Sequence, residues 1–324
     1  MIQNFRYNSA PPFSETLGMT RTQKGLAAAI CSNLLFAALF LYSSWMQPMS
    51  GTDVFMWRMV AMLFGLLALL SLSRSWRQTA AFAQSLGKSP KRWLWLLLPT
   101  PILASQLWLF MWAPVNGEGI NVAMGYFLFP LMMVLLGSVW FKERLAPLQW
   151  LAVALACAGV AHELWRNGTF SWVTVWVFGS YPLYYLMRRA QGVPALTGLF
   201  FDLLLIAPLA LLYLLWQADS LALIAGQPWL IGFIVLLGLN SALAMQLNLQ
   251  ASQMLPFSLF GMLSYLEPIL LFALSLILLN EQTPQGAFIS YGLIWLGLAL
   301  MVWHGMRRGG KRLFNFKQNS LNNQ

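Results

Sequence analysis

Long apolar runs recur along the whole chain, and this feature excludes most folds. Each run approaches the roughly 20 residues that a helix needs to cross a bilayer. The ten runs lie at about 25–46, 54–72, 93–112, 120–141, 148–164, 171–187, 195–216, 228–249, 256–279 and 287–305. They are continuous rather than alternating, which favours helices over barrel strands. The sequence therefore predicts an all-α membrane protein with ten transmembrane helices.

The composition excludes the other classes of chain. Hydrophobic residues make up 59% of the sequence and charged residues only 9%, whereas a soluble domain carries roughly a quarter charged residues. Disordered chains are rich in charge and poor in apolar residues, so they are excluded too. The net charge of +10 arises from basic residues between the apolar runs. It therefore indicates membrane topology, and no nucleic-acid partner is expected.

The basic residues predict the orientation. When loops are assigned alternately to two sides, 17 of the 19 Lys and Arg residues fall on the side of the N-terminus. Only Arg166 lies in an opposite loop, and Arg58 lies inside the second run. Such a bias places both termini in the cytoplasm. The predicted location is the cell (inner) membrane, with many passes.

The two halves of the chain repeat a spacing of residues. Three positions in the first half have a counterpart 138 residues later, and the pairs are Pro130 and Pro268, Glu143 and Glu281, and Gly159 and Gly297. Chance matches in a biased composition are the alternative, but five apolar runs per half favour a duplication. Because five is odd, the second copy is inverted relative to the first. Inverted repeats around a site at the midplane are typical of secondary transporters.

The repeat divides the chain into four segments. A polar N-terminal tail covers 1–24, and the first repeat covers 25–164. The second repeat covers 171–305, and a basic cytoplasmic tail covers 306–324.

Several short motifs resemble a known family. They are Gly125-Tyr126-Phe127, Pro130, Glu143-Arg144-Leu145, Gln149-Trp150-Leu151-Ala152-Val153, Tyr265-Leu266-Glu267-Pro268 and Ile294-Trp295. Together they resemble the EamA family of the drug/metabolite transporter superfamily, and more narrowly its RarD-type branch. The resemblance covers about 24–305. It implies two inverted five-helix EamA repeats and the transport of a small metabolite.

Three ionisable residues lie at membrane depth, inside the apolar runs and away from their last residues: Arg58, Asp202 and Glu267. Such residues usually face an interior cavity or a partner, since a charge at the bilayer centre costs roughly 2.5–3.5 kcal/mol on insertion scales. Glu267 is predicted to exchange a proton for solute, and helix packing is the alternative role. Arg58 either snorkels outward or faces the bundle, where it would suit a carboxylate-bearing solute. Asp202 is interpreted as a solvated or capped carboxylate near the cytoplasmic end.

Amides and aromatic residues in the runs complete the predicted binding site. The predicted substrate-binding residues are Arg58, Gln106, Trp112, Tyr126, Asn240, Tyr265 and Glu267. Pro130 and Pro268 are predicted hinges, because a proline inside a helix removes a backbone hydrogen bond. Most of the 16 tryptophans lie near the ends of runs, where interfacial belts explain them without a substrate.

The sequence carries no enzyme signature. It has no glycine-rich phosphate loop, no paired histidines at metal spacing and no nucleophile elbow. Neither Cys31 nor Cys157, each inside an apolar run, can form a metal knuckle or a disulfide framework. No catalytic residue, metal site or cofactor is expected.

A secondary transporter of a small organic solute is the leading functional hypothesis. The solute would be an amino acid-like metabolite or a drug, and its export would be coupled to proton movement. A facilitator without ion coupling is the second possibility within transport. A non-transporting assembly or receptor protein is the alternative class. Expected partners are the solute and the lipid bilayer. A homodimer contact is a further option, through the small-residue surface of Ala152, Ala154, Ala156, Ala158 and Gly159.

Overall fold

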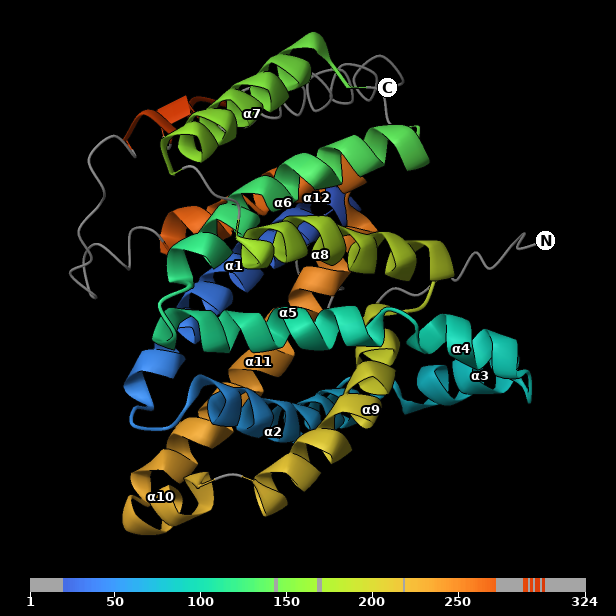
Figure 1. Ribbon diagram of the computed structural model, residues 1–324. Helices are drawn as coiled ribbons and strands as arrows, with labels where there is room; N and C mark the ends of the chain where they lie inside the picture. The colour runs from blue at the N-terminus through green and yellow to red at the C-terminus, as the bar shows by residue number, and fades with distance from the viewer. Residues whose placement is uncertain are drawn as a thin grey trace, which may run out of the picture.

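The computed structural model describes most of the predicted membrane region (Figure 1). Its described residues are 20–142, 145–167, 171–217 and 219–271, together with 288–300 except 291, 294 and 298. Nearly all of the predicted N-terminal tail, the basic tail and the repeat residues Glu143 and Glu281 lie outside these ranges. Every regular element within the described ranges is helical.

The long helices follow the predicted apolar runs. They are α1 (Arg21–Trp45), α2 (Gly51–Leu72), α6 (Gly119–Trp140), α7 (Pro147–Asn167), α8 (Trp172–Gln191), α9 (Ala195–Trp216) and α11 (Trp229–Met254). The shorter elements are α3 (Trp76–Leu86), α4 (Pro90–Leu97), α5 (Thr100–Trp112), the 3₁₀ turn η1 (Ala113–Val115), α10 (Ser220–Gly226) and α12 (Phe257–Leu263).

Seven helical segments are long and apolar enough to cross a membrane. They are α1, α2, the Pro90–Val115 segment from α4 to η1, α6, α7, α9 and α11. Two shorter apolar helices cover Leu259–Leu271 and Phe288–Gly297. Helix α8 has 20 residues but is less apolar, since it carries three tyrosines and two arginines. A membrane protein with many spans is therefore confirmed.

Local sequence signals explain where several helices begin and end. At the start of α1, the Thr20 hydroxyl accepts from the Gln23 backbone, while the Gln23 side chain accepts from the Thr20 backbone. The Ser50 and Ser171 hydroxyls cap α2 and α8 by accepting from the backbone N–H groups of Asp53 and Val173. Gly192 ends α8 with a φ of 64°, a left-handed conformation that glycine adopts without strain.

Two predicted runs are interrupted, which the apolar pattern did not reveal. The third run divides into α4 and α5 around Leu98 and Pro99. The ninth divides at Ser264 and Tyr265, after which helical backbone resumes at 266–271 and carries Glu267. By contrast, Pro130 lies inside the unbroken helix α6.

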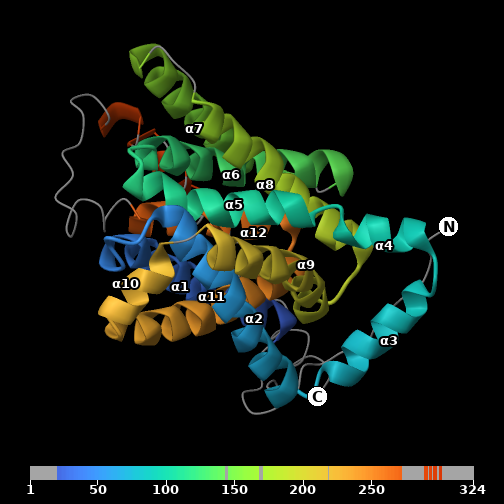
Figure 2. The ribbon, with the colours of Figure 1, turned by 60° about the horizontal axis from the view of Figure 1, so that its bottom comes forward.

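The helices pack as a bundle in which segments distant in sequence are neighbours. Helix α11 packs against α1 and α2, while α2 also packs against α9. Helix α6 packs against α8 and α12, and α5 contacts α2 and α8. A large apolar cluster fills the space between these helices. Helices α3 and α4 lie at one end of the bundle and α10 at the other (Figure 2).

Glycines allow two of these helix pairs to approach closely. A Cβ atom on Gly238 of α11 would lie 2.5 Å from the Ala61 Cβ of α2. A Cβ atom on Gly125 of α6 would lie 2.5 Å from the Val177 Cβ of α8. Small residues at helix interfaces are typical of membrane proteins, where dispersion contacts replace the hydrophobic effect between helices.

Candidate functional site

Arg58 is a fully buried cation in the middle of the bundle, on helix α2. Its side chain is 0% exposed. The Nε atom donates to the Ser241 hydroxyl of α11 at 2.9 Å, and Cζ lies 5.7 Å from the ring centroid of Phe110. Among the described residues, no hydrogen-bond acceptor reaches Nη1 or Nη2. The snorkelling alternative is wrong, because the guanidinium points into the protein.

Glu267 provides an acidic side chain in this region. It is 9% exposed and interacts electrostatically with Arg58, Tyr126 and Tyr181. Within the described ranges, no salt bridge of 4 Å or less joins Glu267 to Arg58. The guanidinium and the carboxyl group therefore share an interior region without a direct ion pair among the described residues.

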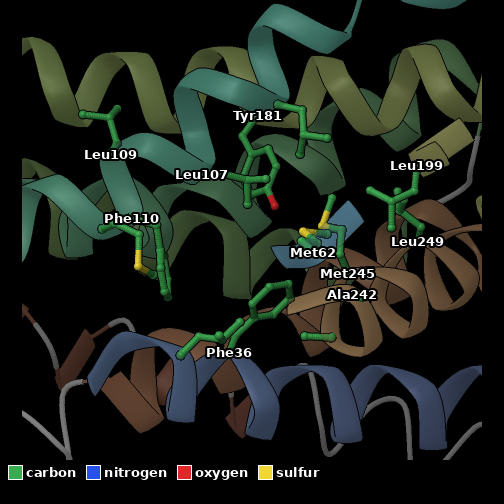
Figure 3. Close-up of a cluster of buried hydrophobic side chains, with 14 of the residues drawn as sticks. Phe36, Met62, Leu107, Leu109, Phe110, Tyr181, Leu199, Ala242, Met245 and Leu249 are labelled. Atoms are coloured by element: carbon green, nitrogen blue, oxygen red, sulfur yellow. The ribbon is translucent and has the colours of Figure 1, made fainter. Parts of the chain in front are cut away.

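Aromatic rings connect the two charged residues. The ring centroids of Phe110 and Tyr126 are 5.8 Å apart, and those of Tyr126 and Tyr181 are 6.3 Å apart. Phe36 of α1 lies 6.4 Å from Phe110 in an edge-on arrangement. Figure 3 shows Phe36, Phe110 and Tyr181 directed toward the same interior region, with Met62 and Met245 beside them. An apolar and aromatic wall thus surrounds the charged groups.

Three amides inside the bundle keep an acceptor that no described residue uses. The Gln106 amide nitrogen donates to Ser180 Oγ at 2.9 Å, and to the main-chain carbonyl of Trp176 at 3.3 Å. Asn33 and Asn240 donate to the carbonyls of Leu263 and Leu35 at 3.2 and 3.4 Å. The side-chain oxygens of all three amides are buried without a partner among the described residues. These oxygens can accept hydrogen bonds from a bound molecule or from water.

A second polar chain extends from the same wall toward α11 and α1. The Tyr185 hydroxyl lies 3.1 Å from the Tyr181 hydroxyl and donates to Asn248 Oδ1 at 2.6 Å. The Asn248 amide nitrogen then donates to Ser32 Oγ at 3.3 Å. This chain fixes the orientation of Tyr181 beside Arg58.

Trp112 and Tyr265 lie apart from the Arg58 group. Trp112 is half-buried and stacks on Trp108 at 5.1 Å. Tyr265 belongs to a separate apolar cluster with Phe127 and Met262, where α6, α7 and α12 meet. The substrate-binding roles predicted for both residues stay predictions.

The two predicted hinges lie on neighbouring elements. Pro130 is on α6, and its carbonyl oxygen would be 3.2 Å from a Cβ on Gly261 of α12. Pro268 follows α12 in the resumed helical segment. Motion at either position stays a prediction.

Asp202 lies in a second buried polar cluster, on α9. It is 0% exposed and forms an ion pair with Arg188 of α8. It also accepts hydrogen bonds from Thr100 at 2.6 Å and from Tyr184 at 3.1 Å. The carboxylate is therefore buried and paired, and its interpretation as a solvated group is wrong.

Four buried polar residues were missed from the sequence: Asn33, Ser241, Tyr181 and Tyr185. The tyrosines form part of a cluster of aromatic residues at 181–185 on the least apolar long helix, which could have marked them. Ser241 and Asn33 each belong to a pair of polar residues in an apolar run, and their partners lie 183 and 230 residues away. No local pattern indicates such pairings. Among the described residues, no group of His, Cys, Asp or Glu could hold a metal ion.

Comparisons with known proteins show similarity to one family of membrane proteins. The EamA-like transporter family matches residues 23–162. An uncharacterized transporter of Haemophilus influenzae is 47% identical, over 87% of this chain and 95% of its own length. The chloramphenicol-sensitive protein RarD of Pseudomonas aeruginosa is 38% identical, over 88% of this chain and 95% of its own length.

More distant matches extend the similarity. Protein RarD of Salmonella typhi is 30% identical over 87% of this chain and 95% of its own length. A crystal structure of a protein 19% identical to this chain has a TM-score of 0.59, covering 88% of this chain and 98% of that protein. This last similarity concerns the fold alone.

Proposed function

Since the chain belongs to the EamA-like transporter family, in its RarD-type branch, we propose that it is a secondary transporter of a small organic solute. The solute is an amino acid-like metabolite or a drug, and the direction is export from the cell. The protein acts in the inner or plasma membrane, with both termini in the cytoplasm. Its relatives are named as transporters rather than enzymes, and the assembly or receptor alternative has no comparable support.

The proposed architecture is ten membrane helices in two inverted repeats. The seven long apolar segments, helix α8 and the two shorter apolar helices make ten candidate spans. In the repeat, α1, α2, α5 and α6 correspond to α8, α9, α11 and α12. When each helix is replaced by its counterpart in the other repeat, the contact of α1 with α11 becomes the contact of α8 with α5. In the same way, the contact of α6 with α8 becomes the contact of α12 with α1. All four contacts occur. The contacts of α1 with α11 and of α6 with α8 are more extensive than their counterparts.

The unequal contacts support transport by alternating access. If the two repeats exchange their conformations, the extensive and sparse contacts exchange as well. A site between them then opens to the other side of the membrane. The proposed site lies where Arg58 and Tyr126 of the first half meet Tyr181, Ser241 and Glu267 of the second half. Gln106 of the first half contacts the second half at Ser180.

One observation carries the proposal: a fully buried guanidinium, where helices of both halves meet, has two nitrogens without a partner in the described part of the chain. An unpaired charge inside a membrane protein is expensive and usually functional. A solute with a negatively charged group would provide the missing acceptors. Glu267, in the same interior region, is the proposed coupling residue, releasing a proton when solute binds and recovering it after solute leaves.

Flux measurements in proteoliposomes test this function. The purified protein should move at least one solute from a panel of labelled amino acids and antibiotics, faster when a pH gradient is imposed. Glu267→Gln should abolish gradient-driven flux and retain exchange of solute against solute. The control is Asp219→Asn, which removes an exposed carboxylate outside the site and should keep the normal rate. If Glu267→Gln shows gradient-driven flux at the wild-type rate, the coupling role is wrong and helix packing explains this residue.

Cysteine labelling tests the orientation. Cys31 and Cys157 are exposed, so both are first replaced by serine. A cysteine at Ser85, an exposed position at the end of α3, should then react with an impermeant reagent only after the cells are opened. A cysteine at Asn167, the last residue of α7, should react in intact cells. The reverse pattern would contradict the cytoplasmic termini.

A further inference from the structure

We propose that the α3–α4 hairpin, residues 76–97, binds an anionic phospholipid, with the headgroup on the cations of its turn and an acyl chain along α4. This inference goes beyond the proposed transport function and does not depend on it. It is carried by the charge of the hairpin, by the hydrogen bonds of its turn and by an exposed apolar stripe that continues from the turn.

The hairpin is a concentrated region of positive charge at one end of the bundle (Figure 2). Five cations on it or directly before it are exposed: Arg74, Arg77, Lys88, Lys91 and Arg92. The sequence has no Asp or Glu anywhere in 54–117. Within the described ranges, no carboxylate comes within 4 Å of these five side chains. The hairpin therefore presents positive charge alone along its own sequence.

The equivalent connection at the other end of the bundle has the opposite character. Helix α10 connects α9 to α11 as α3 connects α2 to α4. The connection 217–228 contains Asp219 and no Lys or Arg, whereas 73–92 contains five cations and no acid. A helical connection of this kind thus forms without cations. We attribute the cations of the hairpin to the anionic surface that it meets.

Side chains of α4 fix the turn of the hairpin. Arg92 Nη1 and Trp93 Nε1 each donate at 3.0 Å to a main-chain carbonyl, the first at the end of α3 and the second at Gly87 in the turn. The backbone that carries Lys88 and Lys91 is therefore held in one short segment. Two lysines three residues apart on a fixed turn can approach the same phosphate group.

An exposed apolar stripe on α4 continues from these cations. Four exposed residues share one helix face at the i, i+3, i+4, i+7 spacing: Lys91, Leu94, Trp95 and Leu98. The apolar members are 67%, 43% and 50% exposed. The cation lies at the start of α4 and the apolar side chains follow toward the bundle. This is the order of headgroup and acyl chain in a phospholipid, with an indole at the level between them.

The opposite face of α4 is anchored to the bundle. Leu96 is buried in a small apolar cluster with Val193 and Phe201, against which apolar residues of α3 also pack. The Leu96 carbonyl accepts from Arg188 Nη1 at 2.9 Å. The exposed stripe therefore keeps a fixed orientation, so that a lipid can bind it without displacing these contacts.

An anionic phospholipid uses both parts of this surface. A soluble phosphate would contact the cations and leave the leucines in water, while a lipid without net charge would contact the stripe and leave the cations without a counter-charge. Basic clusters beside membrane helices attract anionic headgroups. A charge bias that only orients the chain requires no apolar stripe beside the cations.

Matched lipids test this inference. Thermal stabilisation of the full chain in an uncharged detergent is titrated with phosphatidylglycerol and with phosphatidylcholine of the same acyl chains. The wild type should be half-stabilised at a phosphatidylglycerol concentration about tenfold lower than that of phosphatidylcholine. The soluble compound sn-glycerol 3-phosphate, which has no acyl chain, should not stabilise it. Equal effects of the two lipids would overturn the proposal, and so would full stabilisation by the soluble phosphate.

Variants assign the two contacts. Lys88→Gln with Lys91→Gln should weaken phosphatidylglycerol about 10- to 30-fold, because each cation near an anionic headgroup contributes about fivefold. Lys88→Arg with Lys91→Arg retains the charge and should keep the affinity. Leu94→Ser with Leu98→Ser removes the acyl contact and should weaken both lipids equally.

A matched loss of charge elsewhere provides the control. Arg307→Gln with Arg308→Gln removes two cations from the predicted basic tail and should leave the affinity for phosphatidylglycerol unchanged. An equal loss in this control would mean that net charge, and not the hairpin, attracts the lipid. Wild-type affinity in Lys88→Gln with Lys91→Gln would leave these lysines with a role in orientation alone. No solute flux is measured in these titrations, so failure of this inference leaves the transporter proposal in place.

Discussion

Two buried arginines, Arg58 and Arg188, differ in which nitrogens have partners. In Arg58, Nε donates to Ser241 and both terminal nitrogens are unpartnered among the described residues. In Arg188 the pattern is reversed: Nη2 meets Asp202, Nη1 donates to the Leu96 carbonyl at 2.9 Å, and Nε has no partner within the described ranges. The side chains are 0% and 2% exposed. Burial alone therefore does not distinguish a structural arginine from a ligand-binding arginine.

The difference teaches what each arginine contributes. Arg188 connects α8 to α9 through Asp202 and to α4 through Leu96, so its charge is used to hold three helices together. Its guanidinium also lies 5.5 Å from the Tyr184 ring centroid. Arg58 is held at one nitrogen and presents a free edge. A partnered buried charge indicates a structural role, whereas an unpartnered one indicates a place for a ligand.

The largest expected effect is on stability, at Asp202. Asp202→Asn keeps the shape but leaves the Arg188 charge uncompensated in a buried position, so it should lower the free energy of unfolding by about 3–5 kcal/mol. The double change Asp202→Leu with Arg188→Met removes both charges and should restore much of the loss. Unfolding in mixed detergents measures both. A loss below about 1 kcal/mol in Asp202→Asn would remove the structural role from this pair.

The second prediction compares the two arginines directly. Arg58→Met removes a charge whose two terminal nitrogens lack acceptors among the described residues, so the free energy of unfolding should stay within about 1 kcal/mol of the wild type or rise. Arg188→Met is the matched control and should lose about 3–5 kcal/mol, because Asp202 is left as an unpaired buried charge. Comparable losses in both variants would contradict the division into a structural and a ligand-binding arginine.

The sequence predicts the helices better than their contacts. Helix α9 covers the predicted run 195–216, because bilayer thickness sets how long an apolar run must be. The breaks before α5 and after α12 were missed, since apolar residues continue through both. Arg58 and Glu267 were found because a charge is conspicuous in an apolar run. That Tyr181 rather than Tyr265 lies beside Arg58 depends on how helices rotate and pack, which no local pattern reports.

The smallest expected effect is at Ser241, the residue that orients Arg58. Ser241→Ala removes the only hydrogen bond of the guanidinium to a described residue. Polar contacts between membrane helices contribute about 0.6 kcal/mol on average, so solute affinity should fall about threefold with little change in stability.

The control for this change lies on the same helix. The Ser252 hydroxyl is also buried, but it donates to the Leu249 carbonyl within α11. Ser252→Ala should therefore leave solute affinity unchanged, as measured by titrating the thermal stabilisation that the best-bound solute produces. A larger loss in Ser241→Ala than in Arg58→Gln would mean that Ser241 contacts the solute itself. Equal affinities in Ser241→Ala and the wild type would mean that the wall of Phe110, Tyr126 and Tyr181 suffices to hold the guanidinium in place.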